Sequence, residues 1–372
     1  MANSFQHTYA QAGVDYEALD TFKRLAQEAA SNTGGNIARA DFSDVSESRG
    51  ESAYLMEAPD YYLAHVEEGL GTKVLVADAM RQLTGKSYYA SIAQDAVAAI
   101  VNDMATLGAR PLSVAMHIAA GSSAWFKDAE RVKDLVDGWK RACDLAQCVW
   151  GGGETPALKD VVAPATAVIG GSAVGIIKPK TRRLSGARIQ HGDAIVLVRS
   201  SGIHANGVSF ARMLAEKLSD GYLTKLRNGR TFGEALLDPA PIYSALVDRC
   251  FENRVDLHYA VHITGHGWRK LMRAREPFAY VIDRVPDAPD LFTFMQEHGP
   301  ISEHDAYSTF NMGAGFALYV PETDVEKILN VAQHFSGQFS VIHAGFVEQS
   351  SEKKVVIKPK HIEFSARDLR IR

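Results

Sequence analysis

Hydrophobic and polar positions along the chain follow helical spacing in some segments and short β-type runs in others. Apolar residues at helical spacing predict helices over residues 11–30, 92–107, up to about 147, from 208, 239–253, 290–298 and 322–334. Short runs rich in Val, Ile and Ala predict strands over residues 72–78, 112–118, 149–150, 161–177, 194–199, 279–285, 314–320 and 338–346.

Strands and helices alternate through both halves of the chain, which favours an α/β (α+β) protein. The length of 372 residues is typical of two domains. A basic turn, KPKTRR, begins at Lys178 and interrupts the series of elements. We therefore predict an N-terminal domain over residues 1–177 and a C-terminal domain over residues 178–372.

The composition narrows the class of protein. Hydrophobic residues make up 46% and charged residues 23%, which excludes a disordered or low-complexity chain. A net charge of −4 provides no general attraction for nucleic acid or an acidic membrane. The chain starts without a signal-peptide pattern, contains no apolar run of about 18 residues, and has three cysteines that fit neither a disulfide framework nor a zinc motif. We expect a cytoplasmic protein with reduced thiols.

The predicted helix over residues 92–107 has two unlike faces. One face is apolar, and the opposite face carries Asp95, Asn102 and Asp103, separated by small alanines. One interpretation is a solvated helix surface. The other is a Mg²⁺ site, because small residues allow close approach and carboxylate and amide oxygens suit a hard cation.

Three glycine-rich segments, predicted to be turns, cover residues 68–73, 151–155 and 200–207. Glycine lets the backbone approach a ligand, and the start of a helix offers N–H groups to an anion. Each segment alone is typical of an ordinary turn. Together, with Lys, Glu, Ser, His and Asn among them, they favour a phosphate-binding enzyme.

Several other motifs are incomplete. Residues 85–87 resemble the end of a phosphate-binding loop, but Met80 stands where that loop needs glycine. His258, His262 and His266 have the spacing of a metal-binding helix, yet glycines flank His266 and argue against a continuous helix and against zinc.

Motifs along the chain resemble those of one family in sequence order. They are YAQAGVDYEALD, EEGLGTK, DAVAAIVNDMATLGARPL, GGET, SSGIHANG, HYAVHITGHG and TFNMGAG, from about Tyr9 to Phe346. They resemble the motifs of aminoimidazole ribonucleotide synthetases (phosphoribosylformylglycinamidine cyclo-ligases) in the PurM-like superfamily. The resemblance implies two α/β domains, with N-terminal strands of two subunits joined into a shared barrel in a homodimer. It also implies ATP-dependent closure of the imidazole ring of a ribonucleotide substrate, with Mg²⁺.

The resemblance also implies roles for individual residues. The catalytic residues would be Lys73, Asp95, His204 and His262. The ATP site would use Gly71, Thr72, Lys73, Gly152, Gly153 and Glu154. The substrate site would use Ser201, Gly202, His204, Asn206, Gly207 and Thr264, and the Mg²⁺ ligands would be Glu68, Asp95, Asn102 and Asp103.

The chain departs from the family pattern at four places, and at one of them, residues 32–50, the family's glycine-and-phenylalanine segment is not recognisable. Glu68 replaces an aspartate, His266 replaces the middle glycine of HITGGG, and the segment after GGET lacks the family's usual residues. These departures leave an alternative open, in which a divergent ATP-binding paralogue acts on another substrate or senses nucleotides without turnover. Selenophosphate synthetase is disfavoured because the first cysteine is Cys143.

Overall fold

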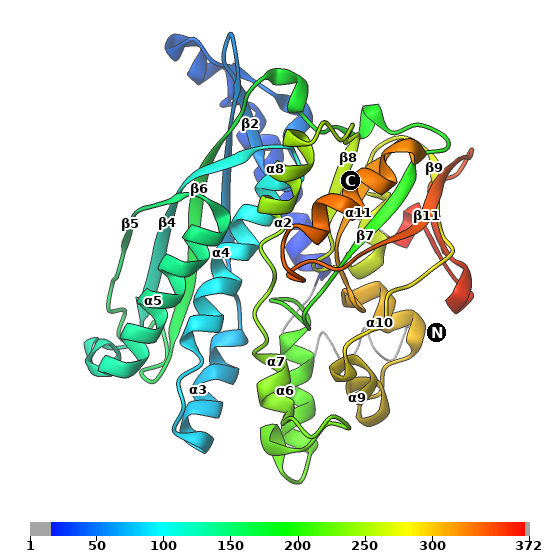
Figure 1. Cartoon of the computed structure of the whole chain (residues 1–372). Helices are drawn as coiled ribbons and strands as arrows, with labels where there is room; N and C mark the ends of the chain where they lie inside the picture. Colours follow the sequence, from blue (N-terminus) through cyan, green and yellow to red (C-terminus); the bar gives the residue numbers. More distant parts are fainter. Residues whose placement is uncertain (1–15, 369–372) are drawn as a thin grey trace.

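A computed structural model describes residues 16–368. Figure 1 shows two α/β halves side by side, each built on one sheet, which confirms the predicted fold class. The first sheet has the strand order β1-β2-β3-β6-β4-β5, and the second has the order β13-β12-β9-β11-β7-β10-β8. None of the described helices is long and apolar enough to cross a membrane.

The N-terminal half contains six strands and four α-helices along the described chain. The strands are β1 (Ser43–Asp44), β2 (Tyr54–Glu57), β3 (Tyr62–Gly69), β4 (Arg110–Ala120), β5 (Val149–Glu154) and β6 (Ala167–Ile177). The helices are α2 (Tyr16–Ser31), α3 (Lys73–Thr84), α4 (Tyr89–Ala105) and α5 (Ala129–Ala146). The first residues of the predicted helix over 11–30 lie outside the described part of the chain.

Helix α4 is the central packing element of this half, as its apolar face predicted. Ile100 and Met104 are fully buried on that face. Two glycines of β6 let α4 come close to the sheet: a Cβ at Gly171 would meet Ile100 Cδ1 at 3.3 Å, and one at Gly175 would meet Met104 Sδ at 2.2 Å. The helix packs on the sheet because β6 has no side chain at these positions.

The strand predicted over residues 72–78 is wrong, since these residues form the start of α3. The buried residues Val74, Ala77 and Met80 recur at helical spacing, but the apolar run alone is too short to distinguish a strand from a buried helix. The loop over residues 70–72 therefore joins the end of β3 to a helix start.

The turn predicted over residues 151–155 is also wrong, because the three glycines lie within β5. This strand pairs in parallel with β4 at the edge of the sheet. A Cβ at Gly151 would meet Ser113 Oγ at 2.1 Å, and one at Gly153 would meet the Met116 carbonyl oxygen at 2.2 Å. Glycine here allows close strand contact instead of reversing the chain.

The C-terminal half contains the second sheet and its covering helices. Its strands are β7 (Ala194–Arg199), β8 (Tyr259–His262), β9 (Phe278–Ile282), β10 (Ala314–Val320), β11 (Val341–Gln349), β12 (Lys354–Ile357) and β13 (Ile362–Ser365). Its helices are α6 (Val208–Lys217), α7 (Phe232–Leu236), α8 (Ser244–Glu252), α9 (Asp290–His298), α10 (Glu303–Thr309) and α11 (Val325–Gln333). The helix predicted over 239–253 begins later, at Ser244.

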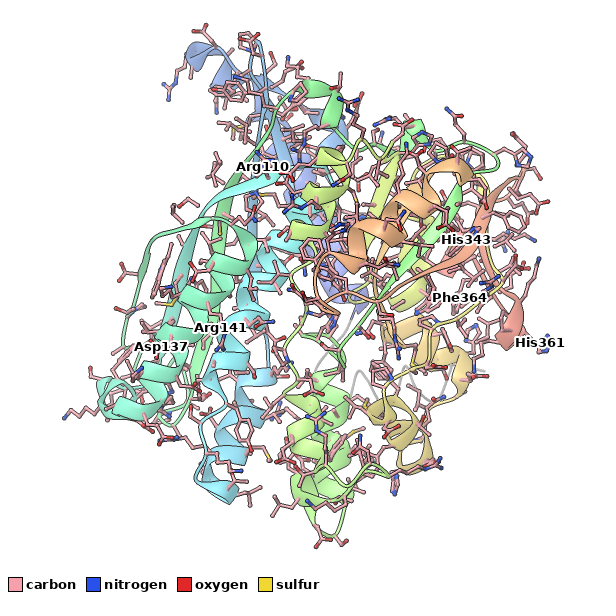
Figure 2. The ribbon with its side chains drawn as sticks, in the orientation of Figure 1. Arg110, Asp137, Arg141, His343, His361 and Phe364 are labelled. Atoms are coloured by element: carbon pink, nitrogen blue, oxygen red, sulfur yellow. The ribbon has the colours of Figure 1, made fainter. Side chains whose placement is uncertain are left out.

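One carboxylate of α8 helps to join the two halves. Asp248 accepts hydrogen bonds from Arg110 of β4 at 2.9 Å and from Arg182 of the connecting segment at 2.6 Å. Figure 2 shows Arg110 between the first sheet and α8. The segment that contains the predicted domain boundary is thus bonded to α8, which is bonded in turn to β4.

Candidate functional site

The polar face of α4 is covered by residues 238–243 of the C-terminal half, not by solvent. Asn102 is fully buried, donates to the Pro241 carbonyl at 2.9 Å and accepts from the Tyr243 N–H at 2.7 Å. Asp95 accepts from the Ala240 N–H at 2.8 Å. The two side chains therefore fasten the second half of the chain to α4.

Asp95 also forms a buried ion pair with the first residue of α3. Lys73 Nζ lies 2.6 Å from Asp95 Oδ2, and both side chains have no exposed surface. The same ammonium donates to the Asp238 carbonyl at 3.0 Å. Burial raises the pKa of Asp95, while the Lys73 charge and the Ala240 N–H oppose that rise. The β3–α3 loop is thereby fixed against both α4 and the C-terminal half.

A second polar cluster lies further along α4, where β3 ends and β8 ends. His262 Nδ1 lies 2.6 Å from Asp103 Oδ1. Burial opposes ionisation of Asp103, but the hydrogen bond and charge of His262 hold the pKa of Asp103 below its ordinary value. Because a carboxylate can only accept, Nδ1 of His262 donates this hydrogen bond.

Glu68 and Lys270 complete this cluster. Burial and the neighbouring Asp103 carboxylate raise the pKa of Glu68 to about 7. Burial and Arg273 lower the pKa of Lys270 to about 8, although Asp103 and Glu68 oppose the shift. Lys270 also donates a hydrogen bond to Thr264. Two carboxyl groups, an imidazole and an amine from both halves thus share one buried environment.

The third glycine-rich segment, predicted as a substrate site, is a rigid turn between β7 and α6. Asn311 donates to the Gly202 carbonyl at 2.8 Å and accepts from Ser200 Oγ at 2.7 Å, and Ser201 Oγ donates to the Pro239 carbonyl at 2.7 Å. Gly207 adopts a left-handed φ of 88°, and a Cβ there would meet the Phe310 ring at 2.3 Å. This turn leads directly into α6.

His204 lies in the same turn, and its side chain is buried without a hydrogen bond to the described residues. It is 4% exposed, and neither ring nitrogen has a partner among residues 16–368. Burial holds the pKa of His204 well below 6.5, so the ring is neutral. The Tyr243 ring lies 6.3 Å from both the His204 and the His262 rings. A neutral imidazole without a protein partner can still bind a ligand.

The four predicted Mg²⁺ ligands do not meet at one point. Asp95 and Asp103 are eight residues apart on α4, which separates them by about 12 Å along the helix axis. Within residues 16–368 no three His, Cys, Asp or Glu side chains gather as a metal site. Glu68 and Asp103 interact directly, whereas Asp95 and Asn102 bind residues 238–243.

The predicted ATP-site residues of β5 lie across the sheet from this cluster. Gly69, Gly170, His117 and Glu154 stand in one row of neighbouring strands. Three strand spacings place Glu154 about 14 Å from Gly69. Gly152, Gly153 and Glu154 are exposed on the edge strand, while Gly71, Thr72 and Lys73 lie at the start of α3, where Lys73 contacts Asp95 of α4. Within one chain the two parts of the predicted ATP site therefore lie three strands apart.

Two residues of the site were not predicted from the sequence. Lys270 and Tyr243 stand in no motif that was singled out, although Lys270 follows Thr264 by six residues. The signal available for Lys270 was its place shortly after the glycine-rich end of a strand.

Asn206 and His258 were also singled out in the sequence. Asn206 is partly buried and lies close to Gly265. His258 binds Asp193 at 2.8 Å as a structural contact.

The fold and the polar junction define a protein with two α/β halves that meet at a shared polar site. The family model for the N-terminal domain of AIR synthase related proteins matches residues 50–177, and the C-terminal model matches residues 190–358. The chain belongs to the AIR synthase related family.

Named relatives agree with this membership, and solved structures share the fold. The phosphoribosylformylglycinamidine cyclo-ligase of Methanococcus maripaludis is 32% identical over 348 residues, covering 93% of each chain. That of Carboxydothermus hydrogenoformans is 31% identical over 372 residues, covering 94% of this chain and 98% of the relative. A HypE–HypF complex structure shares the fold with a TM-score of 0.59 at 15% identity, over 85% of this chain and 92% of that one. A thiamine-monophosphate kinase from Stenotrophomonas maltophilia gives 0.57 at 15% identity, over 88% and 94%.

Proposed function

We propose that the protein is an ATP-dependent cyclo-ligase. It would close the imidazole ring of formylglycinamidine ribonucleotide and yield aminoimidazole ribonucleotide, ADP and phosphate. The observation that carries the proposal is the meeting of Glu68, Asp103, His262 and Thr264 around Lys270 at the junction of the two halves. Named relatives that match nearly the whole chain support the same reaction.

The carboxyl pair fits a divalent cation. The raised pKa of Glu68 reflects burial together with repulsion from Asp103, and a cation between the two groups would remove that repulsion. We assign Glu68 and Asp103 as the groups that would hold Mg²⁺. The ion would neutralise charge on the ATP phosphates. Asp95 and Asn102, expected as ligands, would then act by holding residues 238–243 in place.

The remaining predicted residues would bind and orient the two substrates. Gly71 and Thr72 would present backbone N–H groups at the start of α3 to ATP phosphates, with Lys73 fixing the loop from beneath. Ser201, Gly202, Asn206, Gly207 and Thr264 would line the ribonucleotide site beside the neutral His204. Ring closure requires alignment more than a protein nucleophile, which suits this rigid turn.

Proton movement and substrate orientation would fall to the two histidines. His262 has its Nδ1 proton held by Asp103, so Nε2 is free to accept a proton from the attacking nitrogen of the substrate. His204 is neutral and has both ring nitrogens available for ligand hydrogen bonds. His262 would therefore take the proton as the new C–N bond forms, and His204, on which burial disfavours a charge, would orient the substrate by hydrogen bonding.

A homodimer would supply the missing part of the ATP site. The edge strand β5 carries Gly152, Gly153 and Glu154 at an exposed border. Apolar side chains lie exposed on the same sheet, with Val149 63% and Val168 54% accessible. Covering these side chains with a second sheet in a shared barrel would remove apolar surface from water. Sedimentation of the full chain tests this arrangement, and a monomer that turns over would contradict it.

The alternative is a PurM-like paralogue that binds ATP and acts on another substrate or on none. His266 favours it, because this residue stands with a left-handed φ of 72° where the family has glycine. Its side chain adds bulk beside Thr264. A changed substrate pocket would follow from that bulk.

The deciding experiment measures ADP release with Mg²⁺-ATP, with and without formylglycinamidine ribonucleotide. We expect ADP only with the ribonucleotide, in equal amount to aminoimidazole ribonucleotide. Asp103→Asn should abolish turnover, whereas Asp137→Asn, on the outer side of α5 (Figure 2), should leave it unchanged. Tight ATP binding without substrate-stimulated turnover would favour the paralogue.

A further inference from the structure

The C-terminal end of α5 brings two cysteines together. Gln147 adopts a left-handed φ of 54°, and its N–H donates to the Asp144 carbonyl at 3.1 Å. The Cys148 N–H donates to the Cys143 carbonyl at 3.0 Å. These two bonds form a Schellman motif, in which the side chains of the first and last residues contact each other. Cys143 and Cys148 occupy those two positions.

The surroundings of the two thiols differ. Cys143 is buried with 3% of its surface exposed, whereas Cys148 is partly accessible. The neighbouring Cys143 side chain lowers the pKa of the Cys148 thiol. The accessible sulfur is therefore the better nucleophile, and the buried sulfur lies next to it.

We propose that Cys143 and Cys148 form a redox-active dithiol that a small-molecule disulfide of the glutathione type converts into an intramolecular disulfide. The Schellman backbone carries the proposal, because its hydrogen bond from residue 148 to residue 143 brings the two Cβ atoms to one side of the helix end. The bond would close a ring of six residues around Gln147 at the entrance to β5.

The chemistry is a pair of thiol–disulfide exchanges. The Cys148 thiolate attacks one sulfur of the small disulfide, whose S–S bond breaks and releases one thiolate. Cys143 then gives its proton to that thiolate and attacks the Cys148 sulfur, displacing the second small thiolate, which takes up the proton that Cys148 had released. The protein loses two electrons and two protons, and the small disulfide gains both to become two thiols.

Cys250 provides the internal comparison. It is fully buried in α8, and burial raises the pKa of its thiol to about 12. No other cysteine lies beside it in the sequence or in its helix. It should stay reduced under conditions that oxidise the pair.

The test treats the native full chain with oxidised glutathione, quenches in denaturant with an alkylating agent, and maps the peptides by mass. We expect residues 143 and 148 linked within one peptide, Cys250 alkylated, and full reversal by dithiothreitol. Cys143→Ser should trap Cys148 as a stable glutathione mixed disulfide, because the resolving sulfur is gone. Cys148→Ser should leave the native protein unreactive.

Other results would overturn the proposal. A lasting mixed disulfide in the unaltered protein would mean that Cys143 does not reach Cys148. Unreacted thiols throughout, or oxidation of Cys250 at a similar rate, would contradict the assignment of Cys148 as the accessible nucleophile. Peptide mapping of the unaltered chain decides these points even if a serine variant folds poorly.

Discussion

Lys73 of α3 and Asp95 of α4 form an ion pair with 2.6 Å between Nζ and Oδ2, and both side chains are completely buried. Each also bonds to the backbone of residues 238–240 in the other half of the chain. A buried ion pair contributes little compared with a well-packed apolar pair, but removing one partner leaves an uncompensated charge. The pair therefore makes the position of the β3–α3 loop depend on the junction between the halves.

This relationship predicts a large loss of stability when only one charge is removed. Lys73→Met should lower the free energy of unfolding by about 3–5 kcal/mol, because the Asp95 carboxylate stays buried without its cation. Lys73→Met combined with Asp95→Asn should recover most of that loss. Urea unfolding followed by circular dichroism provides the measurement. If the double variant lost as much stability as the sum of the two single-variant losses, the two groups would not be coupled.

Gly71 and Gly207, in two of the glycine-rich turns, predict different losses of stability on substitution by alanine. Gly71 and Gly207 both have left-handed φ angles, of 73° and 88°. A Cβ at Gly71 has no neighbour within 4 Å, whereas one at Gly207 would meet the Phe310 ring at 2.3 Å. Gly71→Ala should cost about 1 kcal/mol through backbone strain, and Gly207→Ala about 3 kcal/mol, since a clash is added. Thermal unfolding of both variants checks the order, and a reversed order would contradict it.

Two histidines, the buried His204 and the partly buried His266, predict a loss of stability at acid pH. Burial holds the pKa of His204 well below 6.5 and lowers that of His266 to about 3. The unfolded chain binds these protons below about pH 6.5, while the folded chain does not, so stability falls as the pH drops through this range. Each histidine contributes a slope of up to about 1.4 kcal/mol per pH unit.

The measurement compares urea unfolding at about pH 7 and about pH 5. His204→Gln and His266→Gln should each reduce the stability difference between the two pH values. His334→Gln, at an exposed position, is the control and should change nothing. An unchanged difference in His204→Gln would mean that this ring takes up its proton without unfolding.

The sequence predicted the elements that local spacing determines. The apolar face of α4 followed from helical periodicity, and Ile100 and Met104 are fully buried as that face requires. The same periodicity placed Asp95 and Asn102 together on the other face. It could not reveal that residues 238–243 cover them, because that contact joins positions about 140 residues apart.

The glycines in the sequence did not distinguish a turn from a close contact between strands. Gly207 lies in a turn with positive φ, as predicted, but Gly151 and Gly153 lie in an edge strand that needs close contact with β4. A missing side chain serves either purpose, and only the neighbouring strand distinguishes them. Lys270 was missed for a related reason, since its partners Glu68 and Asp103 come from the other half of the chain.

Two asparagines are expected to have different roles, Asn102 in stabilising the fold and Asn206 in binding the substrate. Asn102 is fully buried with both amide atoms bonded across the junction, and Asn206 has no hydrogen bond within residues 16–368. Asn102→Ala should cost about 3 kcal/mol of stability, because the Pro241 carbonyl and the Tyr243 N–H lose their partners. Asn206→Ala should leave stability within about 0.5 kcal/mol and raise the KM for the ribonucleotide about tenfold, the loss of one ligand hydrogen bond. Urea unfolding and steady-state kinetics on both variants supply the comparison. A destabilised Asn206→Ala with unchanged KM would make that residue part of the fold and remove it from the substrate site.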